Sequence, residues 1–345
     1  MLESNLGGAF AAASLVVIRT WYPHVFPGSE AHSLFAWPVF IQVLDLGGAP
    51  LLLFFVYFVN FQIVRAFTAR RGQGSAVPAL ALNREAALRY GGSDLVVLPE
   101  LPVGYHCRAE AGRDIPPLAK ETGTAFMLPC TSMIGDKGEA YYNSVIVIDK
   151  DGAVGEEYRK LLLVPFGEYI PMERQLPFLR RIFPGVMTFV VGNHGEVIYD
   201  FGKGRRLIPS LCYEAIFTGH SRRFVEHGCN VLINMVDDAW FGKSPASTIH
   251  MSLALYRAVE YRIPLVRVTN SGVGIFVQPT GEIVPGSRTP LFRKAATAHR
   301  LYIPPERSPY TRWGNAFLYG LSGLVVVGLG WCWLTRRNPK VPEAM

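Results

Sequence analysis

Short apolar runs rich in β-branched residues recur through the middle of the chain and predict the strands of a sheet-based domain. They lie at 94–99, 124–130, 142–149, 207–212, 231–236, 264–270 and 273–279. Helical patterns lie between some of them, notably at 83–90 and 246–262. Strands that alternate with helices are typical of layered α/β domains. Because runs such as 231–236 are apolar on both faces, we expect their sheet to be covered on both sides.

Longer apolar segments flank this domain and are candidates for membrane spans. Residues 38–64 and 317–334 are long enough to cross a bilayer, whereas 7–18 has only about half the required length. For 317–334, a buried core helix is the alternative. The predicted organisation is an N-terminal membrane segment at 1–65 with one clear and one doubtful span, a linker at 66–80, a catalytic domain at 81–316, a transmembrane helix at 317–335 and a basic tail at 336–345.

Composition and charge support a membrane location for part of the chain. Half of the 345 residues are apolar, the mean hydropathy is +0.20 and the formal net charge is +7. A basic balance can indicate nucleic acid, anionic lipid or the flanks of membrane helices. Arg65, Arg70 and Arg71 follow one apolar run, and Arg336 and Arg337 follow another. This favours membrane flanks, and the absence of an aromatic-laced basic patch argues against a nucleic-acid partner.

The five cysteines indicate neither a zinc site nor a disulfide framework. Their number is odd and no pair has the CxxC spacing: they are Cys107, Cys130, Cys212, Cys229 and Cys332. We therefore expect no metal site and no cofactor, and at least one thiol must be free.

Cys212 and Glu100 both occur where a predicted strand ends. A nucleophile at a strand end is accessible while its backbone is fixed, and the turn offers N–H groups to an oxyanion. For Cys212 the alternative is a buried structural thiol. Glu100 ends the run DLVVLPE, where desolvation would raise its pKa and suit a general base. A solvated loop acid is the alternative there.

Lys160 lies in the apolar segment YRKLLLVPFGEYIP. Its ammonium is expected either to reach solvent or to pair with buried carboxylates, although a surface lysine is the commoner case. Beside Glu100 and Cys212 it would favour the thiolate and stabilise an oxyanion. Glu168 and Glu214 are candidates for acids that hold this lysine or a nearby loop in place.

Taken in chain order, the segments LVVLPE, YRKLLLVPFGEYIP, LCYE and DDAWFG resemble the signatures of the nitrilase, or carbon–nitrogen hydrolase, superfamily. The resemblance implies an α/β fold, a nitrilase-like α-β-β-α sandwich flanked by transmembrane helices. It also implies a Glu–Lys–Cys triad with Glu100 as base, Lys160 as oxyanion stabiliser and Cys212 as nucleophile. More narrowly, VPFGEYIP and DAWFG look like the apolipoprotein N-acyltransferase family of bacterial envelopes.

This narrower resemblance implies roles for six further residues: assisting acids at Glu168 and Glu214, an aromatic lining at Tyr213, Trp240 and Phe241, and a place near the site for Asn270. It implies that a fatty acyl chain passes from a phospholipid, through a thioester on Cys212, to the N-terminal amine of a diacylglyceryl-cysteine lipoprotein. It further implies a multi-pass protein of the bacterial inner membrane with a periplasmic catalytic domain. The loop charges within residues 65–71 would instead place that domain in the cytoplasm.

Alternatives remain open at this point. The resembling family has a larger membrane bundle ahead of its catalytic domain, so a catalytically impaired shortened paralogue, or a partner chain that supplies further membrane helices, is also consistent with the sequence. A membrane-tethered amidase or nitrilase would use water to resolve the thioester. A lipid or lipoprotein binder that lost catalysis is the remaining class.

Overall fold

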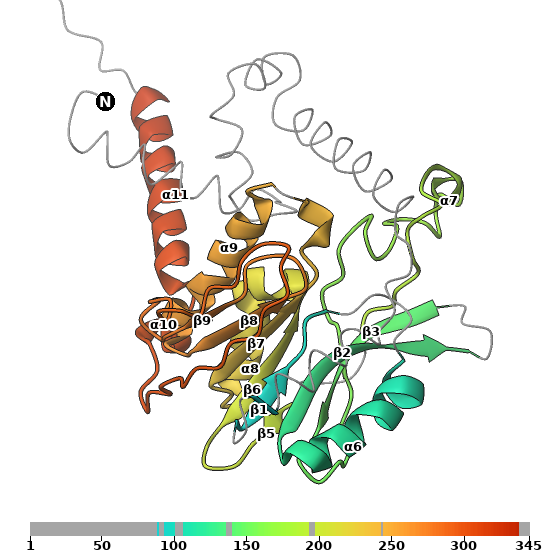
Figure 1. Ribbon diagram of the computed structural model, residues 1–345. Helices are drawn as coiled ribbons and strands as arrows, with labels where there is room; N and C mark the ends of the chain where they lie inside the picture. The colour runs from blue at the N-terminus through green and yellow to red at the C-terminus, as the bar shows by residue number, and fades with distance from the viewer. Residues whose placement is uncertain are drawn as a thin grey trace, which may run out of the picture. The chain divides into compact units, whose positions relative to one another are not determined.

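The computed structural model describes most of the predicted catalytic domain and the two helices after it (Figure 1). The described residues are 88–89, 93–100, 106–135, 140–192, 197–242 and 244–337. The predicted membrane segment 1–65, the linker 66–80 and most of the basic tail lie outside them, as does most of the predicted helix 83–90. The described residues belong to two compact units, one that ends at Ser308 and one that begins at Pro309.

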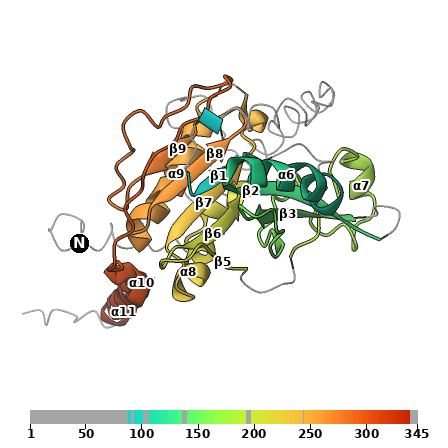
Figure 2. The same ribbon diagram turned by 60° about the horizontal axis from the view of Figure 1, so that its bottom comes forward.

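The first sheet has four strands in the order β1-β2-β3-β4. They are β1 (Leu95–Val97), β2 (Ala125–Ile134), β3 (Ala140–Ile148) and β4 (Tyr158–Arg159). β1 and β2 are parallel, and their connection contains a π-helical turn, η1 (Cys107–Ala111), and helix α6 (Gly112–Thr122). α6 packs along β2 and β3, as Figure 2 shows. The predicted strands at 94–99, 124–130 and 142–149 are confirmed. Helix α6 was not predicted: its buried residues Ile115, Leu118 and Ala119 have helical spacing, but Pro116 and Pro117 argue against a helix.

The second sheet has five strands in the order β5-β6-β7-β8-β9. They are β5 (Tyr199–Asp200), β6 (Arg206–Leu211), β7 (Val231–Val236), β8 (Leu265–Thr269) and β9 (Ile275–Val277). The central three are parallel, so each connection must cross over; α8 (Thr218–Glu226) and α9 (Ala246–Tyr261) do so and pack on β6 and β8. All six residues of β7 are buried, which confirms that this sheet is covered on both sides.

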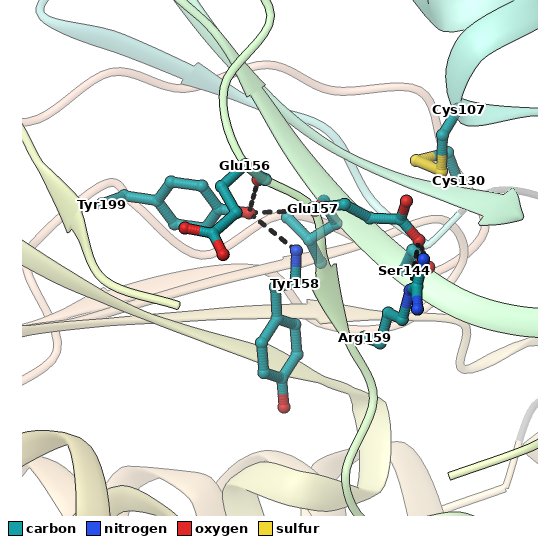
Figure 3. Close-up of a disulfide and its surroundings, with 9 residues drawn as sticks. Cys107, Cys130, Ser144, Glu156, Glu157, Tyr158, Arg159 and Tyr199 are labelled. Carbon is teal, nitrogen blue, oxygen red and sulfur yellow. Dashed lines mark hydrogen bonds and ion pairs between the residues drawn. A yellow bond between two sulfur atoms is a disulfide. The ribbon is translucent and has the colours of Figure 1, made fainter. Parts of the chain in front are cut away.

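The two sheets pack together in one layered domain. The Tyr199 hydroxyl of β5 donates to the carbonyl of Val145 in β3 at 2.9 Å, and it accepts from the backbone N–H of Tyr158 at 3.2 Å (Figure 3). Helix α6 covers the first sheet, and α8 and α9 cover the second. This layering agrees with the predicted α-β-β-α sandwich.

A disulfide joins Cys107 of η1 to Cys130 of β2 (Figure 3). Both cysteines are buried in the hydrophobic cluster that α6 forms with β2 and β3. The expectation that the cysteines form no disulfide framework was therefore wrong for this pair. The two are 23 residues apart, and no spacing motif marks them, because the β1-to-β2 connection alone brings η1 onto β2.

The unit after Ser308 contains α10 (Pro309–Trp313) and α11 (Ala316–Arg337). α11 includes the predicted segment 317–334 and confirms that it is helical. Several of its apolar side chains are more than half exposed, among them Leu324, Val326, Val327, Trp331 and Leu334. Within the described ranges, no helix combines the length and the apolar composition that crossing a membrane requires.

Candidate active site

The strand ends bring the candidate residues to one edge of the domain. Glu100 follows β1, Cys212 follows β6 and Asp237 follows β7. Glu100 links the two sheets, because one carboxylate oxygen accepts from Asn143 Nδ2 of β3 at 2.8 Å and the other from the backbone N–H of Asp237 at 3.0 Å. Burial raises the pKa of Glu100 from 4.5 to about 7, although the Lys160 charge opposes this shift. A carboxyl with this pKa is suited to exchange protons near neutral pH.

Lys160 lies directly after β4, and only 1% of it is exposed. Its Nζ lies 2.7 Å from Oε1 of Glu168. Burial by itself would lower the pKa of Lys160, but the Glu168 and Glu100 carboxylates outweigh that effect and raise it. The side chain is therefore a permanent ammonium within the site. Of the arrangements that the sequence left open, Lys160 is thus buried and paired with a partly buried carboxylate, and it is not a surface lysine.

Glu168 is held in turn by Asn143, which the sequence reasoning missed. Asn143 Nδ2 donates to Glu168 Oε1 at 3.0 Å as well as to Glu100, and the backbone N–H of Val164 donates to Glu168 Oε2 at 2.8 Å. The backbone N–H of Lys160 donates to the Asn143 carbonyl at 2.8 Å. Asn143 thus fixes two carboxylates and the backbone of the lysine. Its only signal in the sequence is an amide within the apolar run 142–149.

Cys212 begins the 3₁₀ turn η2 (Cys212–Ile216) and has a positive φ of 49°. Cys212 is a free cysteine, and the residue as a whole is partly exposed. Burial and the Glu100 carboxylate raise the pKa of the thiol well above its ordinary value, whereas the Lys160 ammonium lowers it. The charges of both predicted partners thus act on the sulfur. The resting form is the neutral thiol, so a nucleophilic reaction would require a base to remove its proton.

Glu214 connects the lysine segment to the cysteine turn and is completely buried. Its carboxylate accepts hydrogen bonds of 2.7 to 3.1 Å from the Tyr158 hydroxyl and from the backbone N–H groups of Leu161, Leu162 and Leu211. It thereby ties the residues after Lys160 to the residue before Cys212. This contact set agrees with the prediction of an acid that holds a loop in place.

The remaining predicted residues occupy different surroundings. Tyr213 is buried and packs edge-on against Phe217, with 4.7 Å between ring centroids. Trp240 and Phe241 are half-buried in the 3₁₀ turn η3 (Ala239–Phe241), directly after Asp237 and Asp238. Asn270 lies one residue beyond β8 rather than within it, and it is exposed. It reaches the site indirectly, because its Nδ2 donates to Asp237 Oδ1 at 2.7 Å.

Beside the site, the chain leaves the sheets as an excursion at residues 169–188, which contains α7 (Leu179–Ile182) (Figure 1). The backbone N–H of Phe189 donates to the carbonyl of Glu168 at 2.9 Å, so a hydrogen bond joins the two residues that flank the excursion. Apolar side chains at Met172, Phe178 and Ile182 are 50 to 63% exposed. We call residues 169–188 the α7 excursion.

No metal site accompanies this arrangement in the part of the chain that the structure describes. There, no group of three or more His, Cys, Asp or Glu side chains is placed to hold a metal ion. The titratable groups whose charges act on one another at this edge are the Cys212 thiol, the Lys160 ammonium and the carboxyl groups of Glu100 and Glu168.

Comparisons with known proteins identify the family of the chain. The family model described as carbon–nitrogen hydrolase matches residues 60–333. Among curated relatives, apolipoprotein N-acyltransferase of Geobacter metallireducens is 36% identical over 252 residues, which are 71% of this chain and 47% of the relative. The protein of the same name from Pasteurella multocida is 30% identical over 263 residues, 73% of this chain and 49% of that one. The chain spans about half the length of these relatives.

A solved amidase of the nitrilase superfamily, from Nesterenkonia AN1, is 20% identical, with a TM-score of 0.48 over 63% of this chain and 82% of the amidase. The family model, by contrast, matches well over half of the chain. The chain therefore belongs to the carbon–nitrogen hydrolase family, with a nitrilase-like α/β fold and with apolipoprotein N-acyltransferases among its relatives.

Proposed function

We propose that the chain is an N-acyltransferase that moves a fatty acyl chain from a phospholipid to the N-terminal amine of a diacylglyceryl-cysteine lipoprotein. The carrying observation is that a buried ammonium, Lys160, and a carboxyl with a pKa of about 7, Glu100, both act on the thiol of Cys212. The relatives named apolipoprotein N-acyltransferase support the substrate class.

In the first step, Glu100 takes the proton of the Cys212 thiol, and the thiolate attacks the ester carbonyl of the phospholipid. The ester C–O bond breaks, and the lysophospholipid leaves with the proton that Glu100 returns. Lys160 stabilises the tetrahedral oxyanion with its fixed positive charge. Because Glu168 holds Lys160 at 2.7 Å, little reorganisation is needed when that charge develops.

In the second step, the lipoprotein amine attacks the thioester, and Glu100 takes the amine proton. The C–S bond breaks, an amide forms, and the proton passes back to the sulfur. Glu168 and Glu214 hold the lysine and the loops. We assign Tyr213, Trp240 and Phe241 to the side of the site that receives acyl chains. Asn270 fixes Asp237, whose backbone N–H binds Glu100.

Lipid substrates require a site that opens at a bilayer. The exposed apolar side chains of the α7 excursion, next to Glu168, support this. The exposed apolar side chains of α11 separately favour contact with a membrane. Exposed Arg174 and Arg181 lie among the apolar residues of the excursion and suit anionic headgroups. We therefore propose that both elements contact the bacterial inner membrane.

We further propose that the domain faces the periplasm. The Cys107–Cys130 disulfide supports this side, because disulfides persist in oxidising compartments and are rare in the cytosol. The charge of the flanking loops is a weaker guide to membrane orientation for a domain of this size, because long domains are translocated largely regardless of their charge.

Mass spectrometry of the purified chain in detergent tests the proposal. With phospholipid alone, we expect one fatty acyl adduct on Cys212; a diacylated lipopeptide added afterwards should remove it and become triacylated. Cys212→Ala should form neither product, whereas Cys229→Ala, which removes a buried thiol outside the site, should form both. An adduct that forms only with small amides or nitriles would replace this proposal with a hydrolase.

A further inference from the structure

The turn that carries Cys212 adopts a backbone conformation that needs support. Its φ of 49° lies in the left-handed region, which residues other than glycine rarely adopt. Such a conformation persists only where surrounding groups hold it. On the N-terminal side, the backbone N–H of Leu211 donates to Glu214 at 2.9 Å. On the other side, Asn234 Nδ2 donates to the Cys212 carbonyl at 3.2 Å.

We propose that Asn234, oriented by Arg267, is a positioning residue that holds the Cys212 turn in its reactive conformation; this rests on the proposed function, in which Cys212 is the nucleophile. Asn234 lies in β7 and is completely buried. It therefore acts through the backbone of Cys212 and does not touch substrate.

The orientation of the Asn234 amide is set by its neighbours. Arg267 Nη1 lies 2.6 Å from Asn234 Oδ1, and a guanidinium can only donate hydrogen bonds. The carbonyls of Ser210 and Cys212, at 3.4 and 3.2 Å from Nδ2, can only accept them. A flipped amide would put donor against donor and acceptor against acceptor. Arg267 thus aims the Asn234 donor at the backbone on both sides of Leu211.

Arg267 is itself fixed by an ion pair. It is 1% exposed in β8, and its Nη2 lies 2.9 and 3.1 Å from the two carboxylate oxygens of Asp238. Asp238 also accepts from Ser247 Oγ at 2.7 Å and contacts His250 Nδ1 at 3.1 Å. The guanidinium partly neutralises a carboxylate whose charge would otherwise disfavour the Cys212 thiolate. The support of the turn therefore extends over β7, β8 and α9.

The decisive variant is Asn234→Asp, which keeps the size of the side chain and an acceptor for Arg267 but removes the donor to the Cys212 carbonyl. We expect kcat for acylation of Cys212 to fall about 10- to 100-fold, because small misplacements of a reacting group have effects of this size. KM for phospholipid should stay unchanged. Alkylation of Cys212 by iodoacetamide, which needs no lipid, should slow as well.

The matched control is Asn230→Asp. Asn230 also joins backbone groups, accepting from the N–H of Arg206 at 2.9 Å and donating to the Gly204 carbonyl, but it lies at the opposite end of β7 from the Cys212 turn. The Asn230→Asp variant should keep the wild-type kcat and the wild-type rate of Cys212 alkylation. If Asn234→Asp does not fold, Asn234→Thr and Asn234→Val take its place, because they differ only in that Thr has a hydroxyl donor where Val has a methyl group. Cys212 should be alkylated and acylated at least tenfold faster in the Thr variant than in the Val variant.

The inference is overturned if folded Asn234→Asp acylates at the wild-type rate, if Asn230→Asp lowers the rate equally, or if the Thr and Val variants react alike. Failure of the proposed function has a different signature: wild-type Cys212 would form no acyl adduct with phospholipid, while the effect of Asn234 on iodoacetamide alkylation would persist.

Discussion

Glu100 and Lys160 show how burial acts on acids and bases within one site. Burial disfavours the charged form of each, but Lys160 faces two carboxylates and remains an ammonium, whereas Glu100 is left with a pKa of about 7. The Cys212 thiol stays neutral because burial and Glu100 outweigh the effect of Lys160. At the scale of residues, the site therefore pairs a protonated nucleophile with a base that titrates near neutral pH.

The first prediction concerns pH. Acylation of Cys212 should rise with pH through about 7 as Glu100 loses its proton, and rapid-quench mass spectrometry between pH 5.5 and 8.5 would measure it. Glu100→Gln should be inactive at every pH. A wild-type rate that does not change over this range would exclude Glu100 as the base.

The same shift predicts a stability effect of known sign. Glu100 loses its proton near pH 4.5 in the unfolded chain but near pH 7 in the folded one, so the folded state binds more protons between these values. Its contribution to the free energy of unfolding is therefore complete below about pH 4.5 and is lost as pH rises through 7. Denaturant titrations at several pH values should show this pH-dependent part of the free energy of unfolding in the wild type. It should be absent in Glu100→Gln.

The second prediction concerns Glu214→Gln. One amide oxygen cannot accept from the four donors that the buried carboxylate now satisfies. We expect the free energy of unfolding to fall by about 1–3 kcal/mol and acylation of Cys212 to slow. Glu226→Gln, at a solvent-exposed ion pair with Arg222, is the control and should change stability by less than about 0.5 kcal/mol. Equal effects of the two variants would contradict the role of Glu214.

At the scale of elements, the site depends on the turns that come directly after the strands. The parallel strands β6, β7 and β8 end at one edge of their sheet, and turns η2 and η3 begin there. β1 brings Glu100 from the other sheet to the same place, where it binds the backbone after β7. The disulfide fastens η1, in the connection between Glu100 and β2, to β2 itself.

The third prediction concerns this disulfide. Closing a loop between residues 23 apart in sequence stabilises the folded chain by about 3 kcal/mol, mainly by restricting the unfolded one. In denaturant titrations without reductant, the free energy of unfolding of the double variant C107A/C130A should be lower than that of the wild type by about this amount. Dithiothreitol should lower the free energy of unfolding of the wild type by a similar amount and leave that of the double variant unchanged. A wild type that does not respond to reductant would argue against the bond.

The fourth prediction concerns the α7 excursion. The double variant F178D/I182D places charges on two side chains that are at least half exposed, so the fold should tolerate it. Burial of such a side chain in lipid is worth about 1.5–3 kcal/mol, so binding to phosphatidylglycerol vesicles should weaken at least tenfold in a flotation assay. Tyr302→Asp, at a 64% exposed aromatic outside the excursion, should bind as the wild type does. Equal binding by all three proteins would refute the membrane contact.

For the molecule as a whole, the proposed membrane contact allows two orientations, with the domain in the cytoplasm or in the periplasm. The basic residues that follow the apolar runs indicate the cytoplasm, whereas the disulfide and the proposed function indicate the periplasm. The chain spans about half the length of its curated relatives, and its own cysteines report the side directly.

The fifth prediction is made for the chain in cells. Of the five cysteines, two form the disulfide, which leaves three thiols: Cys212, Cys229 and Cys332. After denaturation, with hydroxylamine to cleave any thioester, maleimide-polyethylene glycol should label three sites without reductant and five with it. Five labelled sites without reductant would place the domain in a reducing compartment.

Local patterns in the sequence were enough to predict several features. The strands of the parallel sheet are mainly apolar runs, interrupted by Asn234 in β7 and Arg267 in β8, and Glu100 and Cys212 mark the points where two predicted strands end. The predicted helix at 246–262 matches α9. These features could be recognised because periodicity and burial act over a few neighbouring residues.

Tertiary structure alone decided the features that join distant segments. The Cys107–Cys130 bond, the hydrogen bonds from Asn143 to Glu100 and Glu168, and the Arg267–Asn234 contact all join residues at least 23 positions apart in the chain. No local motif marks these residues as partners, because a hydrogen bond or a disulfide depends on positions in space that neighbouring residues do not encode. For the same reason the sequence could propose the three central residues, but only the folded chain could show which groups orient them.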